Sequence, residues 1–438
     1  MNSQVPARIA NILINALKGG VVPRVGLEYI TVGRAQEISA ILRDIDMISD
    51  GGASFRFIVG KYGSGKSFLL QTIRNYATAK GFAVVDADLS PERRFAGTKG
   101  QGLATYKELL HNLSTKSKPD GGALPLILEK WISNIQTSIK AQTDLTGDAF
   151  DYQVEKQIYT VAASLEGMVN GFEFAKAIVA YWNAYRKDDA AKKSNVLKWF
   201  RGEYASRREA KIDLDINFIV TDETWYDFLK ILAAFLVSAG YKGLLVLIDE
   251  LVNIFKIPNS ITRQNNYEKI LTIYNDVLQG KAKHIGFLMG GTPQCIEDKY
   301  RGVYSYEALR SRLAEGHFAT DGLKDLSAPI IRLQMLTQEE MYVLVEKLRD
   351  IHAQLNNYTP ILKHEDLLYF LTVEYNRVGA DTHITPREII RDFIELAGIL
   401  HQNPQKSAAE ILGGNSFEMA KGGLSDEEIH SDFLEFEI

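Results

Sequence analysis

The stretch at residues 60–67 has the sequence Gly-Lys-Tyr-Gly-Ser-Gly-Lys-Ser, which matches the pattern G-x-x-x-x-G-K-[ST]. It follows the β-rich apolar run 55–59 and precedes a helical pattern at 66–80. Glycines in such a loop let backbone N–H groups turn toward phosphate oxygens, and the dipole of the following helix adds to the attraction. This order predicts a phosphate-binding loop in a parallel α/β sheet.

The residue types in this loop fit a nucleoside triphosphate together with a divalent cation. Lys66 brings a positive charge to the β- and γ-phosphates, and the hydroxyl of Ser67 is a ligand for Mg²⁺. The predicted cofactors are therefore ATP and Mg²⁺. The expected binding residues in and beside the loop are Gly60, Lys61, Tyr62, Gly63, Ser64, Gly65, Lys66, Ser67 and Phe68.

A second chemical element is the string Leu-Leu-Val-Leu-Ile-Asp-Glu at residues 244–250. An apolar strand of this kind carries its last side chains to the carboxyl edge of a parallel sheet, where ligands bind. Asp249 would hold Mg²⁺, and Glu250 would orient or deprotonate the attacking water. A second acid directly after Asp249 favours hydrolysis over a small-molecule kinase reaction.

Three more side chains are candidates for contact with the reacting phosphate. Thr292 follows the apolar run 284–289 and could touch the γ-phosphate, although a turn residue beside a proline would give the same sequence. Arg310 or Arg312 could reach the phosphate of a neighbouring subunit, which requires an oligomer. Surface salt bridges are the alternative, and the sequence does not choose between the two arginines.

Arg387 is the last candidate. Thr385 suits a helix N-cap and Pro386 suits the first helical position, so Arg387 would lie in the first turn. A positive charge there opposes the helix dipole, which indicates an external partner such as phosphate. An ordinary surface arginine on a capped helix is the alternative.

Strand and helix patterns together predict an α/β fold with several domains. Residues 97–222 have helical patterns and little strand signal, so we expect a large helical insertion within the sheet domain. We also expect the sheet to end by residue 326. The predicted parts are N-terminal helices and a linker (1–50), an α/β core (51–326), a helical lid domain (327–403) and an acidic tail (404–438). The tail is either solvated or a docking or autoinhibitory segment.

Composition excludes several classes of protein. The net charge of -5 argues against a uniformly basic nucleic-acid coat, although a local basic patch remains open. A single cysteine, Cys295, excludes a disulfide framework and fits a reducing compartment. The longest apolar runs fall short of a membrane span, and no signal peptide is recognisable. We therefore expect a cytoplasmic protein without membrane contact.

One basic stretch is interleaved with aromatic residues, a combination that can bind single-stranded nucleic acid. A solvated helix face is the more common explanation for such a pattern, and we favour it. The stretch consists of Lys192, Lys193, Lys198, Arg201, Arg207 and Arg208, with Trp199 and Tyr204 between them.

Taken together, these elements stand in the order found in AAA+ ATPases, and the chain resembles the Orc/Cdc6-like branch of that superfamily. Several strings are also similar to the bacterial BrxD ATP-binding proteins of BREX phage-defence loci. These strings are Gly-Leu-Glu (26–28), Val-Gly-Arg (32–34), the loop at 60–67, Asp-Leu-Ser-Pro (88–91) and Thr-Pro-Arg (385–387).

The resemblance implies an AAA+ core, a homo-oligomer, and work beside a DNA helicase or another defence protein. It implies that Arg34 lies in the linker on the adenine side, that Arg310 or Arg312 is the arginine finger, and that Arg387 is the second sensor. The spacing from Ser67 to Asp249 is much longer than a minimal core requires, which leaves ring geometry open.

The predicted function is ATP hydrolysis coupled to DNA-associated remodelling or to helicase loading in antiphage defence. The alternative is a switch or scaffold that is controlled by ATP and ADP and turns over little. The net acidic charge and the lack of a clear nucleic-acid-binding motif favour the alternative.

Overall fold

The computed structural model describes residues 4–313, 325–376 and 385–413. Contacts between residues divide the chain into two compact units. We call Thr31–Thr337 the sheet unit, and we call Met1–Ile30 with Gln338–Ile438 the helical unit.

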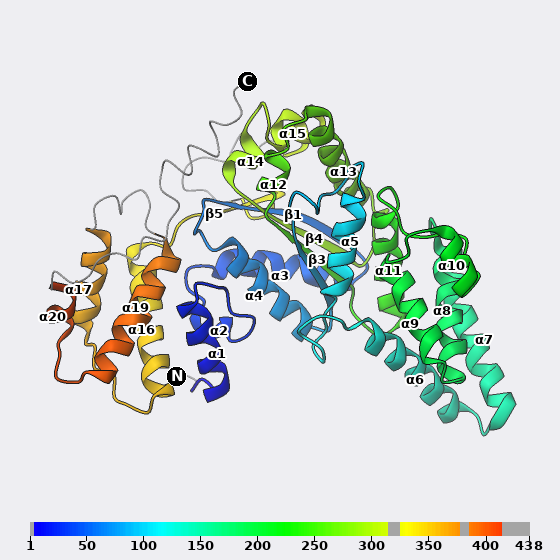
Figure 1. Cartoon of the computed structure of the whole chain (residues 1–438), viewed down its shortest axis with the longest axis horizontal. Coiled ribbons are helices and arrows are strands. Elements are labelled where there is room, and N and C mark those ends of the chain that lie inside the picture. Colours follow the sequence, from blue (N-terminus) through cyan, green and yellow to red (C-terminus); the bar gives the residue numbers. More distant parts are fainter. Residues whose placement is uncertain (1–3, 314–324, 377–384, 414–438) are drawn as a thin grey trace. The chain divides into compact units, whose positions relative to one another are not determined.

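Five parallel strands form the sheet, in the order β2-β3-β4-β1-β5 (Figure 1). The α/β fold with a parallel sheet is thereby confirmed. The strands are β1 (Ala53–Gly60), β2 (Ala83–Asp88), β3 (Leu244–Asp249), β4 (Ile285–Gly291) and β5 (Ile330–Leu333).

The expectation that the sheet ends by residue 326 is wrong, because β5 pairs with β1 in parallel, with Phe57 opposite Ile330 and Gly60 opposite Leu333. A strand of four residues is too short for its apolar period to be told apart from that of a helix. The consequence is that the phosphate loop, which follows β1, lies between β4 on one side and β5 on the other.

Side chains alternate between the two faces of the sheet, and each face has its own apolar core. Ile58 points into a core with α3 (Ala35–Ser49) and α4 (Lys66–Ala79), whose apolar residues lie at helical spacing. Its neighbours Phe57 and Val59 point into the opposite core, which α11 (Trp225–Ser238) and α13 (Ser260–Leu278) cover. Since both faces are covered, β4 and the part of β3 before Asp249 are apolar on both sides.

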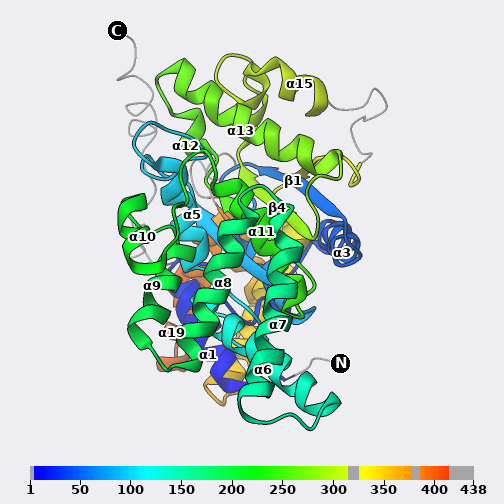
Figure 2. The same ribbon diagram turned by 90° about the vertical axis from the view of Figure 1, so that its right-hand side faces the viewer.

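The helical insertion follows β2 and ends before β3. Its helices are α5 (Gln101–His111), α6 (Leu124–Gln142), α7 (Gly147–Glu166), α8 (Gly171–Arg186), α9 (Ala190–Phe200) and α10 (Arg207–Leu214). The helices from α6 to α10 pack on one another in sequence order, and they face the viewer in Figure 2, whereas α5 packs against β2 and α11. The buried core of the insertion is rich in aromatic side chains, among them Phe174, Trp182 and Trp199.

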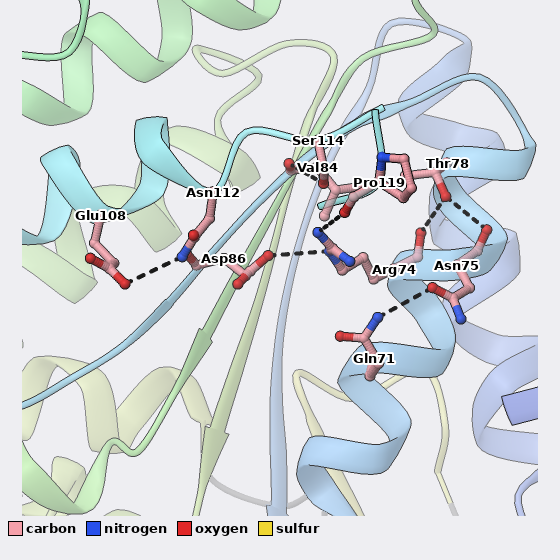
Figure 3. A network of polar contacts seen from close by, with 10 residues as sticks. All are labelled: Gln71, Arg74, Asn75, Thr78, Val84, Asp86, Glu108, Asn112, Ser114 and Pro119. Carbon is pink, nitrogen blue, oxygen red and sulfur yellow. Dashed lines mark hydrogen bonds and ion pairs between the residues drawn. The ribbon is translucent and has the colours of Figure 1, made fainter. Parts of the chain in front are cut away.

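A polar network joins the helix after the phosphate loop to the base of this insertion (Figure 3). Arg74 of α4 has a side chain that is only 3% exposed, and its Nε lies 3.2 Å from the carboxylate of Asp86 on β2. The same guanidinium donates to the carbonyl of Pro119 at 2.6 Å, and Asn112 donates to the carbonyl of Asp86 at 2.9 Å. The network therefore fixes α4, β2 and the segment before α6 to one another.

Shorter elements complete the sheet unit beyond β3. They are α12 (Val252–Phe255), α14 (Pro293–Glu297), a 3₁₀ turn (Val303–Ser305) and α15 (Glu307–Leu313).

The helical unit combines both ends of the described chain. Helix α1 (Ala7–Lys18) packs against α16 (Gln338–Leu355) and α19 (Pro386–Gln402). The backbone N–H of Val5 donates to Gln354 at 3.2 Å, which fixes the start of the chain to the end of α16. The other helices of this unit are α2 (Leu27–Ile30), α17 (His364–Tyr375) and α20 (Ala408–Gly413). Most of the predicted acidic tail lies outside the described residues.

Within the described residues, no helix combines the length and apolar character that crossing a bilayer requires.

Candidate nucleotide-binding site

The phosphate loop connects the end of β1 to the start of α4. Gly65 precedes α4 with φ at +87°, a left-handed conformation that favours glycine. Close packing beneath the loop also requires Gly60, because a Cβ there would lie 2.9 Å from the carbonyl oxygen of Leu333 on β5. The loop is thus a fixed backbone cradle. Tyr62 at its tip is 67% exposed.

Lys66 begins α4 and turns its amine back over the loop. Its Nζ donates to the carbonyls of Gly60 at 2.9 Å and Lys61 at 3.0 Å. Burial lowers the pKa of Lys66, and the negative charges of Asp249 and Glu250 oppose that shift. A half-buried cation above a loop of backbone N–H groups is suited to an anionic ligand.

Ser67 and Asp249, the two residues that we proposed as Mg²⁺ ligands from the sequence, meet at the carboxyl edge of the sheet. The hydroxyl of Ser67 donates to Asp249 Oδ2 at 2.6 Å, and the N–H of Glu250 donates to Asp249 Oδ1 at 2.8 Å. The carboxylate approaches β4 closely, since a Cβ on Gly290 would clash with Asp249 Oδ1. Two oxygen ligands from distant segments are therefore held side by side.

These residues fit Mg²⁺ in the way that nucleotide sites usually hold it. Among residues 4–313, 325–376 and 385–413, no group of three or more His, Cys, Asp or Glu side chains could hold a metal ion. Mg²⁺ does not need such a group, because it keeps water and phosphate oxygens among its ligands. Ser67 and Asp249 would hold the ion, which would neutralise phosphate charge.

A third carboxylate, which we quoted from the sequence only within the string 88–91 and did not name as a site residue, lies at the same edge. Asp88 ends β2 and pairs in register with Asp249 at the end of β3. Burial raises the pKa of Asp88, with further contributions from the negative charges of Asp249 and Asp86. Burial likewise raises the pKa of Glu250, and repulsion from Asp249 and Asp88 adds to this shift. Glu250 therefore holds a proton more readily than an ordinary glutamate.

The backbone at Glu250 is strained and braced. Its φ is +61°, in the left-handed region that a residue with a Cβ rarely adopts. The next residue, Leu251, donates its N–H to the carbonyl of Gly290 at 3.1 Å. Asn253 donates to the carbonyl of Leu89, just after Asp88, at 2.8 Å. Such strain persists only where neighbouring contacts hold it, and it is concentrated at functional sites.

Thr292 caps the short helix α14. Its hydroxyl accepts a hydrogen bond from the N–H of Cys295 at 3.3 Å, which is the local turn role considered for it. Its contact with phosphate stays a prediction. Burial raises the pKa of Cys295 to about 11, so its thiol is protonated at neutral pH.

The two finger candidates lie on the surface of the sheet unit, on α15. Arg310 forms an ion pair with Glu307 at 2.6 Å, one turn earlier on the same helix. Arg312 donates to the carbonyl of Ala308 at 2.6 Å and is exposed. Both guanidinium groups have local partners, and the finger role stays a prediction for each.

Arg387 belongs to the helical unit, in the first turn of α19. The expected cap is present, because Thr385 accepts from the N–H of Glu388 and its own N–H donates to Glu388 Oε2 at 2.7 Å. The aliphatic part of Arg387 lies near Gly20, at the end of α1. The sensor role of Arg387 stays a prediction.

Arg34 is 6% exposed and points at protein backbone. Its guanidinium donates to the carbonyls of Ser64 in the phosphate loop at 2.9 Å and Gln334 after β5 at 2.6 Å. The resemblance implied a place beside the adenine, and contact with nucleotide stays a prediction.

In the basic stretch of the insertion, the aromatic side chains are buried. Trp199 is 1% exposed and Tyr204 is 2% exposed, so neither offers a face on which bases could stack. Two of the cations have acidic neighbours, since Lys193 pairs with Asp188 at 3.1 Å and Arg201 pairs with its neighbour Glu203 at 2.7 Å. These contacts support the solvated helix face that we favoured.

A parallel sheet with a phosphate loop after β1 and the acid pair Asp249 and Glu250 at the end of β3 is consistent with a nucleotide-binding protein that has a P-loop core of the AAA+ type. The family model of the BREX system ATP-binding protein BrxC/D matches residues 5–416, and the chain belongs to this family. Its role is therefore ATP binding in phage defence. No curated protein matches the sequence.

Proposed function

We propose that the chain hydrolyses ATP in the presence of Mg²⁺ and couples this reaction to DNA-associated remodelling or helicase loading. The observation that carries the proposal is the 2.6 Å hydrogen bond between Ser67 and Asp249, with Glu250 directly after it. A phosphate loop alone would support only binding. A second acid beside the metal ligands adds a group that can accept a proton from water.

In this proposal the chain's own residues divide the work. The loop and Lys66 bind the phosphates, Ser67 and Asp249 hold Mg²⁺, and Glu250 accepts a proton from the attacking water. The raised pKa of Glu250 strengthens its basicity near neutral pH, provided that the carboxylate is ionised when water arrives.

The test is the ATPase rate of the purified chain over a range of protein concentrations, with and without DNA. We expect Lys66→Ala to lose binding and Glu250→Gln to bind ATP but lose turnover. Lys80→Ala is a matched control, because Lys80 follows the same helix and pairs with Asp46 on the surface. Normal turnover in Glu250→Gln would remove Glu250 as the base.

A separate measurement tests whether an arginine of one subunit reaches the nucleotide site of its neighbour. If subunits complete one another's sites, the specific activity rises with protein concentration, and either Arg310→Ala or Arg312→Ala abolishes that rise. Unchanged turnover in both variants would remove the arginine finger from the proposal. We extend the proposal to a cytoplasmic homo-oligomer with a helicase or another defence protein as partner.

One observation favours the alternative, a nucleotide-controlled switch or scaffold with little turnover. The burial of Trp199 and Tyr204 removes the stacking surface that the basic stretch of the insertion could have offered to nucleic acid. Gel-shift measurements at several salt concentrations separate the two functions. Salt-sensitive, ATP-dependent binding of DNA supports coupling to DNA, and no binding at low salt supports the switch.

A further inference from the structure

We propose that Arg34 is a positioning residue that ties the phosphate loop to the connection between the two units. This inference deepens the proposed function and rests on it, because the nucleotide is what the loop binds. In this proposal Arg34 acts through hydrogen bonds to backbone carbonyls of the protein.

The contacts of Arg34 join segments that are far apart in the sequence. One nitrogen, Nη2, donates to the carbonyl of Ser64 at 2.9 Å and to the carbonyl of Gln334 at 2.6 Å. A terminal guanidinium nitrogen carries two hydrogens, so it can serve both acceptors at once. Ser64 itself is 2% exposed, and its carbonyl is therefore held from inside the protein.

Arg34 and its acceptor Gln334 lie close in the sequence to the two places where the chain passes between the units. The chain passes from the helical unit into the sheet unit after Ile30, and it leaves the sheet unit after Thr337. Arg34 lies shortly after the first crossing, and Gln334 lies shortly before the second. Both connections are thus linked to the phosphate loop through one buried side chain. A movement at either connection would displace the backbone of Ser64 through Arg34. Conversely, a ligand that fixes the loop would restrain both connections.

A second arginine makes a similar bridge without touching the loop. Arg56 on β1 binds both carboxylate oxygens of Asp44 on α3, at 2.7 and 2.8 Å, and donates to the carbonyl of Ser327 at 2.6 Å. It therefore connects α3 to the segment that leads into β5. Arg56→Met is a matched control, because it removes another largely buried arginine that joins distant segments of the sheet unit through contacts outside the phosphate loop.

The experiment compares Arg34→Met, Arg56→Met and the wild-type chain by calorimetric titration with ADP and by amide hydrogen exchange without nucleotide. In Arg34→Met we expect faster exchange in both 60–67 and 330–337. The affinity for ADP should fall about tenfold, because only a fraction of molecules then holds the loop ready to bind. In Arg56→Met we expect a lower unfolding temperature, faster exchange near residue 327, and an affinity within about twofold of wild type.

Three results would overturn the bridge: unchanged ADP affinity in Arg34→Met, faster exchange in only one of the two segments, or an equal loss of affinity in Arg56→Met. If Arg34→Met does not fold, Arg34→Lys keeps the charge but lacks the planar guanidinium, and we expect a smaller loss in the same direction. Full wild-type affinity and exchange in Arg34→Lys would also contradict the bridge. If the wild-type chain binds no nucleotide, the proposed function fails, while the exchange comparison still tests the bridge by itself.

Discussion

Replacing Glu250 by glycine should stabilise the protein while it abolishes turnover. Glu250 has φ at +61°, where a side chain with a Cβ costs about 1 to 2 kcal/mol. Glycine avoids that cost but loses about 0.5 to 1 kcal/mol of additional chain entropy on folding. The difference leaves a net gain of about 0 to 1.5 kcal/mol for glycine at this position, with a midpoint of about 0.75 kcal/mol.

The proper reference for this gain is Glu250→Gln. Both substitutions remove the carboxylate, so repulsion from Asp249 and Asp88 disappears from both, and only the backbone term differs between them. For a cooperative unit the size of the sheet unit, the gain corresponds to a rise of roughly 1 °C in the unfolding midpoint. Differential scanning calorimetry without nucleotide measures it, and an ATPase assay confirms that both variants are inactive.

The reasoning would be refuted if Glu250→Gly unfolded at the same temperature as Glu250→Gln, or below it. That result would mean that the left-handed turn carries no cost in the folded protein. A gain in Glu250→Gly together with normal turnover would instead refute the catalytic role, because glycine has no group that accepts a proton.

Two further predictions concern the carboxylates around the sheet edge and the network at the base of the insertion. Asp88→Asn removes a negative charge that raises the pKa of Glu250, so Glu250 should stay ionised to lower pH. The acid limb of the pH–rate profile should therefore move to lower pH. Profiles at saturating ATP and Mg²⁺ measure this shift, and a shift to higher pH would contradict the prediction. Removing one partner of a buried ion pair costs about 3 to 5 kcal/mol. Arg74→Met should lower the free energy of unfolding by about 3 kcal/mol, because the side chain of Asp86 is 31% exposed and keeps some contact with water. Urea unfolding should show at least as large a loss for Asp86→Asn, which leaves the guanidinium buried beside a neutral amide.

The sequence was sufficient for those parts of the site that are local in the chain. The loop at 60–67 and the acid pair Asp249 and Glu250 are each written in one short string next to a strand. Their meeting at one sheet edge follows from the rule that parallel strands end together. For the same reason the cap formed by Thr385 could be predicted, since a capping interaction spans a single turn.

What the sequence could not supply depends on pairing between distant segments. Asp88 joins the site only because β2 is the neighbour of β3, and the whole insertion separates these strands in the chain. The bridge from Arg34 requires that β5 lie beside β1, and β5 is itself too short to have been recognised. No periodicity or motif carries this information, because strand order is a property of the sheet.

The strand order also determines when this protein can first bind ATP during its own synthesis. On the ribosome, β1 emerges before both of its neighbours, because β4 and β5 lie about 230 and 270 residues later in the chain. At roughly 5 to 20 residues per second, translation leaves the apolar strand without a partner for something on the order of ten to fifty seconds. The insertion, whose contacts are mostly between successive helices, can fold during that wait. The nascent chain should therefore be unable to bind ATP until residue 333 has been made, and β1 needs protection from aggregation until then.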